Sequence, residues 1–429
     1  MSEKNLLFGC IADDFTGAGD AASFLAAAGM WTMLFTGIPE KSLKEMPQAA
    51  VIALKTRTAP RDEAVKETLE AARWLKEMGA QLIYLKYCST FDSTPNGNIG
   101  PTADALLEEF DEAYTVLCPA LPVNGRTVRE GRLLIDGVPL HRSSMRNHPL
   151  TPMWDDRIQI LMEAQSRYKA YPISIGQVQN GYLPFKTGEQ HFYLIPDYYK
   201  SEHGEEIAKQ YGKLRILTGG SGLISALADI YVQMYGKRNN AYCIQASYGK
   251  TVILAGSCSK VTLGQIDYYQ KNGGISYQIK PQSLLEGIQK IDDVYEFMDT
   301  HSENQVLIYS SASAEKVRES QQYGNERVSS ILETLTARIA VYAVRSGRGR
   351  IIVAGGETSG AVTKALGYHS YFIGESIAPG VPVMVPREDA HIRLVLKSGN
   401  FGQIADGHSA HGYFTIPEGA DGKKLYGTC

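Results

Sequence analysis

LLFGCIADDFTGAGD, at residues 6–20, joins an apolar run to a glycine-broken turn that carries three carboxylates. The apolar part, residues 6–12, is short enough for a buried parallel strand, and AASFLAAA at 21–28 predicts a helix. In open α/β sheets, ligands bind beyond the carboxyl ends of the strands, so we expect Asp13 and Asp14 where chemistry is usually done. A carboxylate there can accept a hydroxyl proton or hold Mg²⁺.

The same alternation of short apolar runs and helix-like stretches continues along the chain and predicts βαβ units with mainly parallel sheets. Strands are expected at residues 49–54, 81–86, 114–118, 191–195, 214–218, 251–255, 305–309, 350–354 and 392–396, and helices at 62–78, 102–110 and 223–235. Between Pro119 and Pro152, the dipeptides Asn124-Gly125 and Asp136-Gly137 predict a β excursion that covers one edge of the first sheet.

The length of the chain, 429 residues, exceeds what one hydrophobic core normally serves. The segment KRNN at residues 237–240 is typical of a linker. We therefore expect an α/β protein of two α/β domains, at residues 1–238 and 246–424, with an interdomain active-site cleft.

The composition limits the kinds of binding partner and the cellular location to be expected. The chain carries 43 basic and 46 acidic residues, a net charge of -3, which gives no electrostatic case for nucleic acid or a membrane surface and favours a small molecule. Six cysteines without a CxxC pair indicate reduced thiols. The N-terminus lacks the pattern of a signal peptide, and no segment approaches the length of a membrane span. We expect a cytoplasmic protein, whose oligomeric state, a homo-oligomer included, stays open.

Glycine-rich turns follow several strand ends. They read TGGSG at 218–222, GSCS at 256–259, GGETSG at 355–360 and KSGNFG at 397–402. A helix N-terminus with bare backbone N–H groups binds phosphate, and glycine lets the phosphate approach. One such turn is common at any strand-to-helix corner, but several in one domain favour a nucleotide. None matches GxxxxGK[ST] or GxGxxG.

Two charged residues of these turns have two readings each. Glu357 could meet a ribose hydroxyl or a metal ion, or be a solvated surface glutamate. Lys397 could pair with phosphate, or lie along the surface with its charge in water. The metal ligands are unknown at this stage.

In the first half, Arg57 follows a strand and can grip a carboxylate with two parallel hydrogen bonds, which suggests an acidic substrate. The alternative is a surface salt bridge to an acid such as Asp62. The run KYCSTFDSTPNGN at 86–98 offers hydroxyls suited to a polyhydroxylated ligand, although such residues also simply build turns. Asp92 could cap the helix that begins near Pro101.

The acids of the opening segment also have a plain structural alternative. Asp14 or Thr16 could be the N-cap of the following helix. Two adjacent acids need more, because like charges held close require a metal, a cation or a shared proton.

Taken together, the segments resemble the four-carbon acid sugar kinase family in one order from about residue 6 to about residue 402. They read IADDFTGAGDAASFL, LKTRT, KYCSTFDSTPNGNIGPTADALLEE, CPALPVNGRTVREG, NHPLTPM, LTGGSGL, LAGSCSKVT, AGGETSG, IAPGVPVM and LKSGNFG. KYCSTFDST and PALPVNGRT are most similar to the 3-oxo-tetronate 4-kinases of that family. The resemblance implies ATP-dependent phosphorylation of the 4-hydroxyl of a four-carbon sugar acid, with ATP and Mg²⁺ as cofactors. D-threonate or D-erythronate 4-kinases, and a non-catalytic ATP-binding sugar-acid sensor, are the alternatives.

The resemblance also implies a substrate domain at 1–238 and a nucleotide domain at 246–424. Matched motif by motif, the catalytic acids are Asp13 and Asp14. The substrate would be bound by Arg57, Lys86, Ser89, Thr90, Phe91, Asp92, Ser93 and Thr94. ATP would be bound by Ser257, Ser259, Gly355, Gly356, Glu357, Thr358, Ser359 and Gly399. The sequence departs from the family at residues 403–408, QIADGH, which leaves the role of the last 25 or so residues open.

Two other enzyme classes fit less well. GAGD at 17–20 is similar to the signature of ribokinase-like kinases, but there the motif lies late in the chain, so Asp20 is expected to be a helix residue near the site. The DxDxT loop of aspartyl-phosphate phosphatases needs acids two positions apart, whereas Asp13 and Asp14 are adjacent.

Overall fold

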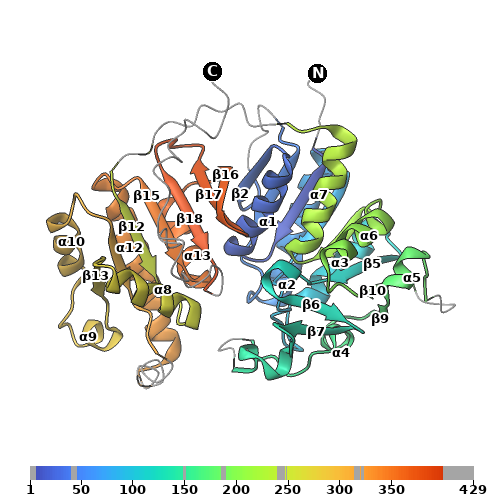
Figure 1. The fold of residues 1–429 in the computed structure, drawn as a ribbon, viewed down its shortest axis with the longest axis horizontal. Helices are drawn as coiled ribbons and strands as arrows, with labels where there is room; N and C mark the ends of the chain where they lie inside the picture. Colours follow the sequence, from blue (N-terminus) through green and yellow to red (C-terminus); the bar gives the residue numbers. More distant parts are fainter. Residues whose placement is uncertain are drawn as a thin grey trace. The chain divides into compact units, whose positions relative to one another are not determined.

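The computed structural model describes residues 6–39, 46–147, 151–184, 190–238, 247, 249–313, 319 and 323–399. The chain divides into two compact units, residues 1–239 and 240–429, drawn from blue to green and from yellow to red in Figure 1. Each unit is an α/β structure built on a mainly parallel sheet, which confirms the predicted fold class. None of the described helices is long and apolar enough to cross a membrane.

The first unit has a parallel sheet in the strand order β2-β3-β1-β4-β11-β5-β10-β9. Its strands are β1 (Phe8–Ala12), β2 (Thr32–Thr36), β3 (Ala49–Ala53), β4 (Leu82–Lys86), β5 (Tyr114–Cys118), β9 (Lys169–Ile173), β10 (Phe192–Pro196) and β11 (Ile216–Gly219). Its helices are α1 (Phe15–Ala28), α2 (Arg61–Glu77), α3 (Ile99–Phe110), α4 (Ile158–Glu163), α5 (Ile175–Gln179), α6 (Ser201–Tyr211) and α7 (Ser221–Tyr235).

The opening segment forms the centre of this unit. Every residue of β1 is buried, as a strand covered on both faces requires. A Cβ at Gly9 would lie 2.9 Å from Cδ1 of Leu75, so glycine lets α2 pack closely on the strand. Right-handed crossovers place α1 and α2 on opposite faces of the sheet. α1 packs beside α7, and α2 packs beside α3.

The predicted β excursion is a separate antiparallel sheet of β6 (Arg126–Arg129), β7 (Arg132–Ile135) and β8 (Val138–Pro139). Asp136-Gly137 forms the turn between β7 and β8, with φ of 50° and 79°. Glu130-Gly131 forms the turn between β6 and β7 in the same way, although the sequence does not single it out. Asn124-Gly125 instead ends a 3-10 turn. The excursion meets the main sheet through the bridge from Val128 to Tyr198, past the end of β10. Its turn at Gly131 also lies against Pro172 of the edge strand β9.

The second unit has the strand order β13-β14-β12-β15-β18-β17-β16. Its parallel strands are β12 (Thr251–Ala255), β13 (Ile275–Gln278), β14 (Val306–Tyr309), β15 (Arg350–Ala354) and β18 (Arg393–Lys397). Its helices are α8 (Lys260–Lys271), α9 (Pro281–Leu285), α10 (Ile291–Thr300), α12 (Asn325–Arg345) and α13 (Gly356–Leu366). The core includes Ile253, Leu307, Ile352 and Val395.

An antiparallel hairpin completes this sheet and was not expected from the sequence. β16 (Ser370–Ala378) pairs with β17 (Val381–Pro386), which also pairs with β18. Its proline and glycine residues are typical of a loop, yet Gly380, with a φ of 80°, makes the turn that lets the strands pair. Pro382 pairs with Ser376 where the register shifts, an irregularity that accommodates a residue without an N–H.

Each sheet contains a point where neighbouring strands send the chain in opposite directions. After β1 the chain crosses to β2 on one side, whereas after the adjacent β4 it crosses to β5 on the other side. β12 leads to β13, and the adjacent β15 leads to β16, in the same opposed way. Open α/β sheets bind ligands at such switch points, beyond the carboxyl ends of the strands. A ligand-binding site is therefore expected at each of the two switch points.

Candidate active site

Backbone hydrogen bonds tie together the loops that follow β1, β3 and β4. The N–H of Asp13 donates to the carbonyl of Lys86 at 3.1 Å. The carbonyl of Asp13 accepts from the N–H groups of Thr56 and Arg57 at 3.1 and 3.2 Å. Asp13, Arg57 and the loop after Lys86, which the sequence places far apart, thus meet at one edge of the sheet.

Arg57 holds both aspartates of the opening segment. Its Nε and Nη2 donate to Oδ2 and Oδ1 of Asp13 at 2.9 and 2.8 Å, and its Nη1 lies 3.0 Å from Oδ2 of Asp14. Oδ1 of Asp14 accepts from the N–H of Gly17 at 2.6 Å, so Asp14 is also the N-cap of α1. A cation therefore compensates the paired acids, and the partners of Arg57 are these two acids instead of Asp62.

Burial and charge oppose each other in this cluster. Burial alone would lower the pKa of Arg57, but Asp13 and Asp14 raise it well above its usual value. Burial raises the pKa of Asp13, and the charge of Arg57 counteracts that shift. A guanidinium has five N–H bonds, of which the contacts to the two acids engage three, so two remain for a ligand as far as the described residues are concerned. The fork itself is filled by Asp13.

Lys86 and Asp20 form a second, deeper ion pair. Nζ of Lys86 lies 3.3 Å from Oδ2 of Asp20, which also accepts from the hydroxyl of Ser221 at the start of α7. Burial lowers the pKa of Lys86, but the nearby acids, Asp20 first, raise it above its usual value. Lys86 therefore stays positively charged. Oδ1 of Asp20 and Oγ1 of Thr16 are buried without a hydrogen-bond partner among the described residues.

The hydroxyl-rich loop after β4 contributes unequally. Asp92 and Ser93 line a small cavity together with Asp13 and Arg57. The cavity measures about 10 Å³, which is room for about one water molecule. Oδ1 of Asp92 accepts from the hydroxyl of Thr90 at 2.6 Å. The structure thus brings Asp13, Arg57, Asp92 and Ser93 around one cavity.

Other residues of this loop face elsewhere. Phe91 is fully buried with a φ of 50° and packs edge-on against Tyr87, so it anchors the loop and does not face a ligand. Thr94 lies farther along, where its hydroxyl accepts from the N–H of Asn96. Ser89 is partly exposed. The cap of α3 is Asn98, so Asp92 does not cap that helix.

The glycine turns of the second unit pack against one another. Ser259 caps α8 by accepting from the N–H of Thr262 at 3.1 Å, and its hydroxyl donates to the carbonyl of Gly399. A Cβ at Gly399 would lie 2.1 Å from Oγ of Ser257, and one at Gly256 would lie 2.2 Å from Oγ1 of Thr358. These glycines are therefore needed for the turns to meet, apart from any role in phosphate approach.

The start of α13 is open in a way that suits a phosphate. A Cβ at Gly356 would have no neighbour within 4 Å, and the preceding Gly355 has a φ of 131°. The buried hydroxyl of Ser359 has no partner among the described residues. Open backbone at a helix N-terminus and an unused hydroxyl fit a nucleotide phosphate. Glu357 is exposed on the same turn.

Ser310 and Ser311 also belong to this edge and were not among the residues expected from the sequence. The N–H of Ser310 donates to the carbonyl of Ala255 at 2.9 Å, which ties the end of β14 to the end of β12. The hydroxyl of Ser311 is buried without a partner in the part of the chain that the structure describes. The signal was available as SSAS at 310–313, directly after an expected strand.

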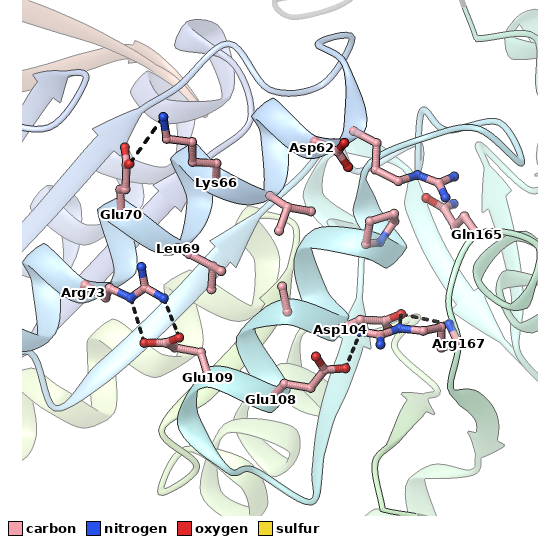
Figure 2. A pocket seen from close by; sticks show the side chains of 14 residues that line it. Asp62, Lys66, Leu69, Glu70, Arg73, Asp104, Glu108, Glu109, Gln165 and Arg167 are labelled. Atoms are coloured by element: carbon pink, nitrogen blue, oxygen red, sulfur yellow. Dashed lines mark hydrogen bonds and ion pairs between the residues drawn. The ribbon is translucent and has the colours of Figure 1, made fainter.

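A larger hollow of about 770 Å³ lies between α2 and α3. Figure 2 shows most of its labelled charged side chains paired with one another, Asp62 excepted. Arg73 forms two hydrogen bonds with Glu109, and Arg167 pairs with Glu108. Because most of its charges are matched internally and it lies mainly between two helices, it does not resemble a catalytic site.

No group of three or more His, Cys, Asp or Glu side chains among the described residues could hold a metal ion. Mg²⁺ commonly uses one or two carboxylates together with substrate phosphates. The donor set therefore fits a metal that arrives with a nucleotide better than a protein-only metal site. Residues 148–150 and 400–408, including Asn400, Phe401 and Gly402, lie outside the described residues.

Known proteins resemble the chain over nearly its full length. A family described as a sugar-binding N-terminal domain matches residues 8–227, and one described as a nucleotide-binding C-terminal domain matches residues 252–405. A 3-oxo-tetronate kinase from Brucella melitensis is 41% identical over 421 residues, with 94% of each chain covered. A 3-oxo-tetronate kinase from Haemophilus influenzae is 38% identical, with 95% of this chain and 100% of the relative covered.

Two solved crystal structures are similar to the chain in both sequence and fold. A crystal structure from Salmonella typhimurium is 38% identical with a TM-score of 0.80, and the match covers 93% of this chain and 97% of that one. One from Haemophilus influenzae is 38% identical with a TM-score of 0.70, covering 92% and 97%.

Proposed function

We infer, because the chain belongs to the four-carbon acid sugar kinase family, that it transfers the γ-phosphoryl group of ATP to the 4-hydroxyl of a 3-oxo-tetronate. It is an ATP-dependent sugar-acid kinase. Its relatives at 37 to 41% identity carry the name 3-oxo-tetronate kinase and align with it over most of the chain. The observation that carries the proposal is the pair Asp13 and Asp14, held by Arg57 at the switch point of the first unit.

The acids supply the proton acceptor. Phosphoryl transfer needs a group that orients the attacking hydroxyl and takes its proton. We assign this role to Asp13 or Asp14. Burial raises the pKa of Asp13, which makes its carboxylate a stronger base than an ordinary aspartate.

The cations supply the attraction for the acid substrate. Arg57 keeps two N–H bonds, so the edge can receive a carboxylate even though Asp13 fills the fork of Arg57. Lys86 is a second cation of this edge, buried and paired with Asp20. The cavity of about 10 Å³ is too small for a four-carbon acid. We therefore place the substrate at its mouth, against Asp92 and Ser93.

The second unit supplies the nucleotide site. The turns at 256–259, 355–359 and 397–399 meet at its switch point and present the start of α13. Bound Mg²⁺ would neutralise phosphate charge, and we propose that it is held mainly by the nucleotide. We further propose that the enzyme works in the cytoplasm, which supplies ATP.

The proposal is tested by measuring ADP release with a panel of acids. The panel contains the D and L forms of threonate, erythronate and their 3-oxo derivatives. We expect the highest kcat/KM for a 3-oxo-tetronate and product phosphorylated at C4. Saturation by a non-oxidised tetronate alone would overturn the substrate assignment, and ATP binding without ADP release would indicate a sensor.

A further inference from the structure

Lys397 is a buried cation without an acid partner among the described residues. It is the last residue of β18 and is 1% exposed. Its Nζ donates to Oγ1 of Thr262 and to the carbonyl of Ser398, both at 3.2 Å. These are neutral acceptors, and an ammonium group has three N–H bonds, so one is left over. A surface position with the charge in water, one of the two readings from the sequence, does not apply.

Lys86, the lysine at the corresponding place in the first unit, has an acid partner that Lys397 lacks among the described residues. Lys86 also ends a buried strand next to a switch point, but Asp20 compensates its charge at 3.3 Å. Burying a charge is costly unless it is paired. Lys397 has no described acid that plays the part of Asp20, so its site is electrostatically complete only when an anion arrives.

The surroundings of Lys397 are those of the expected phosphate site. Its carbonyl accepts from the N–H of Gly355 at 3.0 Å, and Thr262 lies in the first turn of α8. Thr262 donates to the carbonyl of Gly399 at 3.0 Å, which joins the ammonium group to the same cluster of turns. The hydroxyls of Ser311 and Ser359 are buried without a hydrogen-bond partner among the described residues. They are independent evidence that a polar ligand group binds at this edge.

The charge of Lys397 responds to this environment. Burial lowers the pKa of Lys397 to about 8. None of the titratable side chains on the adjoining turns and on α8 and α13 contributes to this shift, whose cause is burial alone. They are Cys258, Lys260, Asp267, Tyr268, Tyr269, Lys271, Glu357 and Lys364. A phosphate beside the ammonium would favour its charged form.

We propose that Lys397 is the phosphate-binding cation of the nucleotide site and that nucleotide binding draws a proton onto it. The identity of the anion as a nucleotide phosphate rests on the proposed function. The only change on Lys397 is gain of a proton by its amine. The proton comes from solvent and returns to solvent when the nucleotide leaves. ATP and ADP share the phosphates that this chemistry recognises, so either serves as a probe.

The first test needs no variant. Binding of Mg·ADP to the full chain is measured by calorimetry at about pH 7.5 and 9 in pairs of buffers with different ionisation enthalpies. For a group that titrates near 8 and stays charged when bound, linkage predicts about eightfold weaker binding at the higher pH. It also predicts uptake of about half a proton per nucleotide at pH 8. Binding without proton uptake would overturn the proposal.

Variants separate a phosphate contact from a merely structural role. Lys397→Met should weaken Mg·ADP binding at least tenfold at pH 7.5 and abolish both proton uptake and pH dependence. Lys397→Arg should keep binding but lose the pH dependence, because arginine does not titrate in this range. Lys364→Met, which removes an exposed lysine of α13, is the matched control and should change nothing. Cys258→Ser should retain the proton uptake; its loss there would assign the proton to the thiol.

The outcome is distinguishable from failure of the proposed function. Normal turnover of a 3-oxo-tetronate without proton uptake on nucleotide binding removes the role of Lys397 and leaves the kinase assignment intact. Proton uptake with Mg·ADP in a protein that phosphorylates none of the acids does the reverse.

Discussion

Arg57 closes its guanidinium fork on Asp13, with Nε 2.9 Å from Oδ2 and Nη2 2.8 Å from Oδ1. The same side chain reaches Asp14 through Nη1. One cation thus holds two adjacent carboxylates at the edge where an acceptor hydroxyl would arrive. It also means that Arg57 has a structural function that a simple substrate clamp would lack.

The paired acids are tested by Asp13→Asn and Asp14→Asn. We expect Asp13→Asn to lower kcat by about 100-fold or more if Asp13 is the proton acceptor. Asparagine is as good an N-cap as aspartate, so Asp14→Asn should keep α1 intact while it removes the carboxylate and its ion pair with Arg57. Steady-state kinetics and thermal unfolding are measured together. Near wild-type turnover in both variants would remove the pair from the mechanism.

Arg57→Ala should raise KM for the acid and also lower the free energy of unfolding, because it leaves Asp13 buried without its partner. A double-mutant cycle with Asp13→Asn should show a coupling of about 1–3 kcal/mol in stability. Urea unfolding of the four proteins gives this number. Additive stabilities would mean that the ion pair does not hold the site together, and an unchanged KM would rule out a carboxylate contact.

Gly356→Ala tests whether a nucleotide phosphate approaches the start of α13, because the substitution should not disturb the packing of the fold. A Cβ there meets nothing within 4 Å, so the fold should tolerate it, and alanine in a helix is favoured over glycine by up to about 1 kcal/mol. We expect nucleotide binding to weaken at least tenfold, because the methyl group occupies the space offered to a phosphate. Gly399→Ala is the contrasting variant, since its Cβ would lie 2.1 Å from Oγ of Ser257 and disturb the turns. Unchanged nucleotide affinity in a folded Gly356→Ala protein would exclude the start of α13 from the site.

Lys397 should make stability without nucleotide depend on pH. Its pKa is about 8 in the folded protein, below the usual 10.5, so the unfolded chain binds more protons between these values and stability rises with pH there. The difference amounts to about 3 kcal/mol when complete. Unfolding at pH 7.5 and above 10 should therefore show a gain in the wild type that Lys397→Met lacks. An equal pH dependence in both proteins would contradict a charged, uncompensated Lys397.

Local pattern was sufficient for much of the fold. The strands at Tyr114–Cys118, Thr251–Ala255 and Arg350–Ala354 begin and end where their apolar runs predict, because burial on both faces selects continuous apolar residues. The acidic turn after the first strand and the glycine turns of the second unit were also readable, since turn chemistry depends on a few neighbouring residues. The β16–β17 hairpin was missed because its prolines and glycine resemble a loop.

The sequence by itself determined that acids, an arginine and glycine turns follow strand ends, and hence that two α/β units carry a kinase-like set of residues. Only the tertiary structure decided which of them meet. Asp13 and Arg57 are 44 positions apart, and Lys397 and Thr262 are 135 positions apart. Such contacts arise from strand order and register, which no local pattern encodes. Compensation of buried charge is likewise a property of neighbours in space, so the paired Lys86 and the unpaired Lys397 looked alike in the sequence.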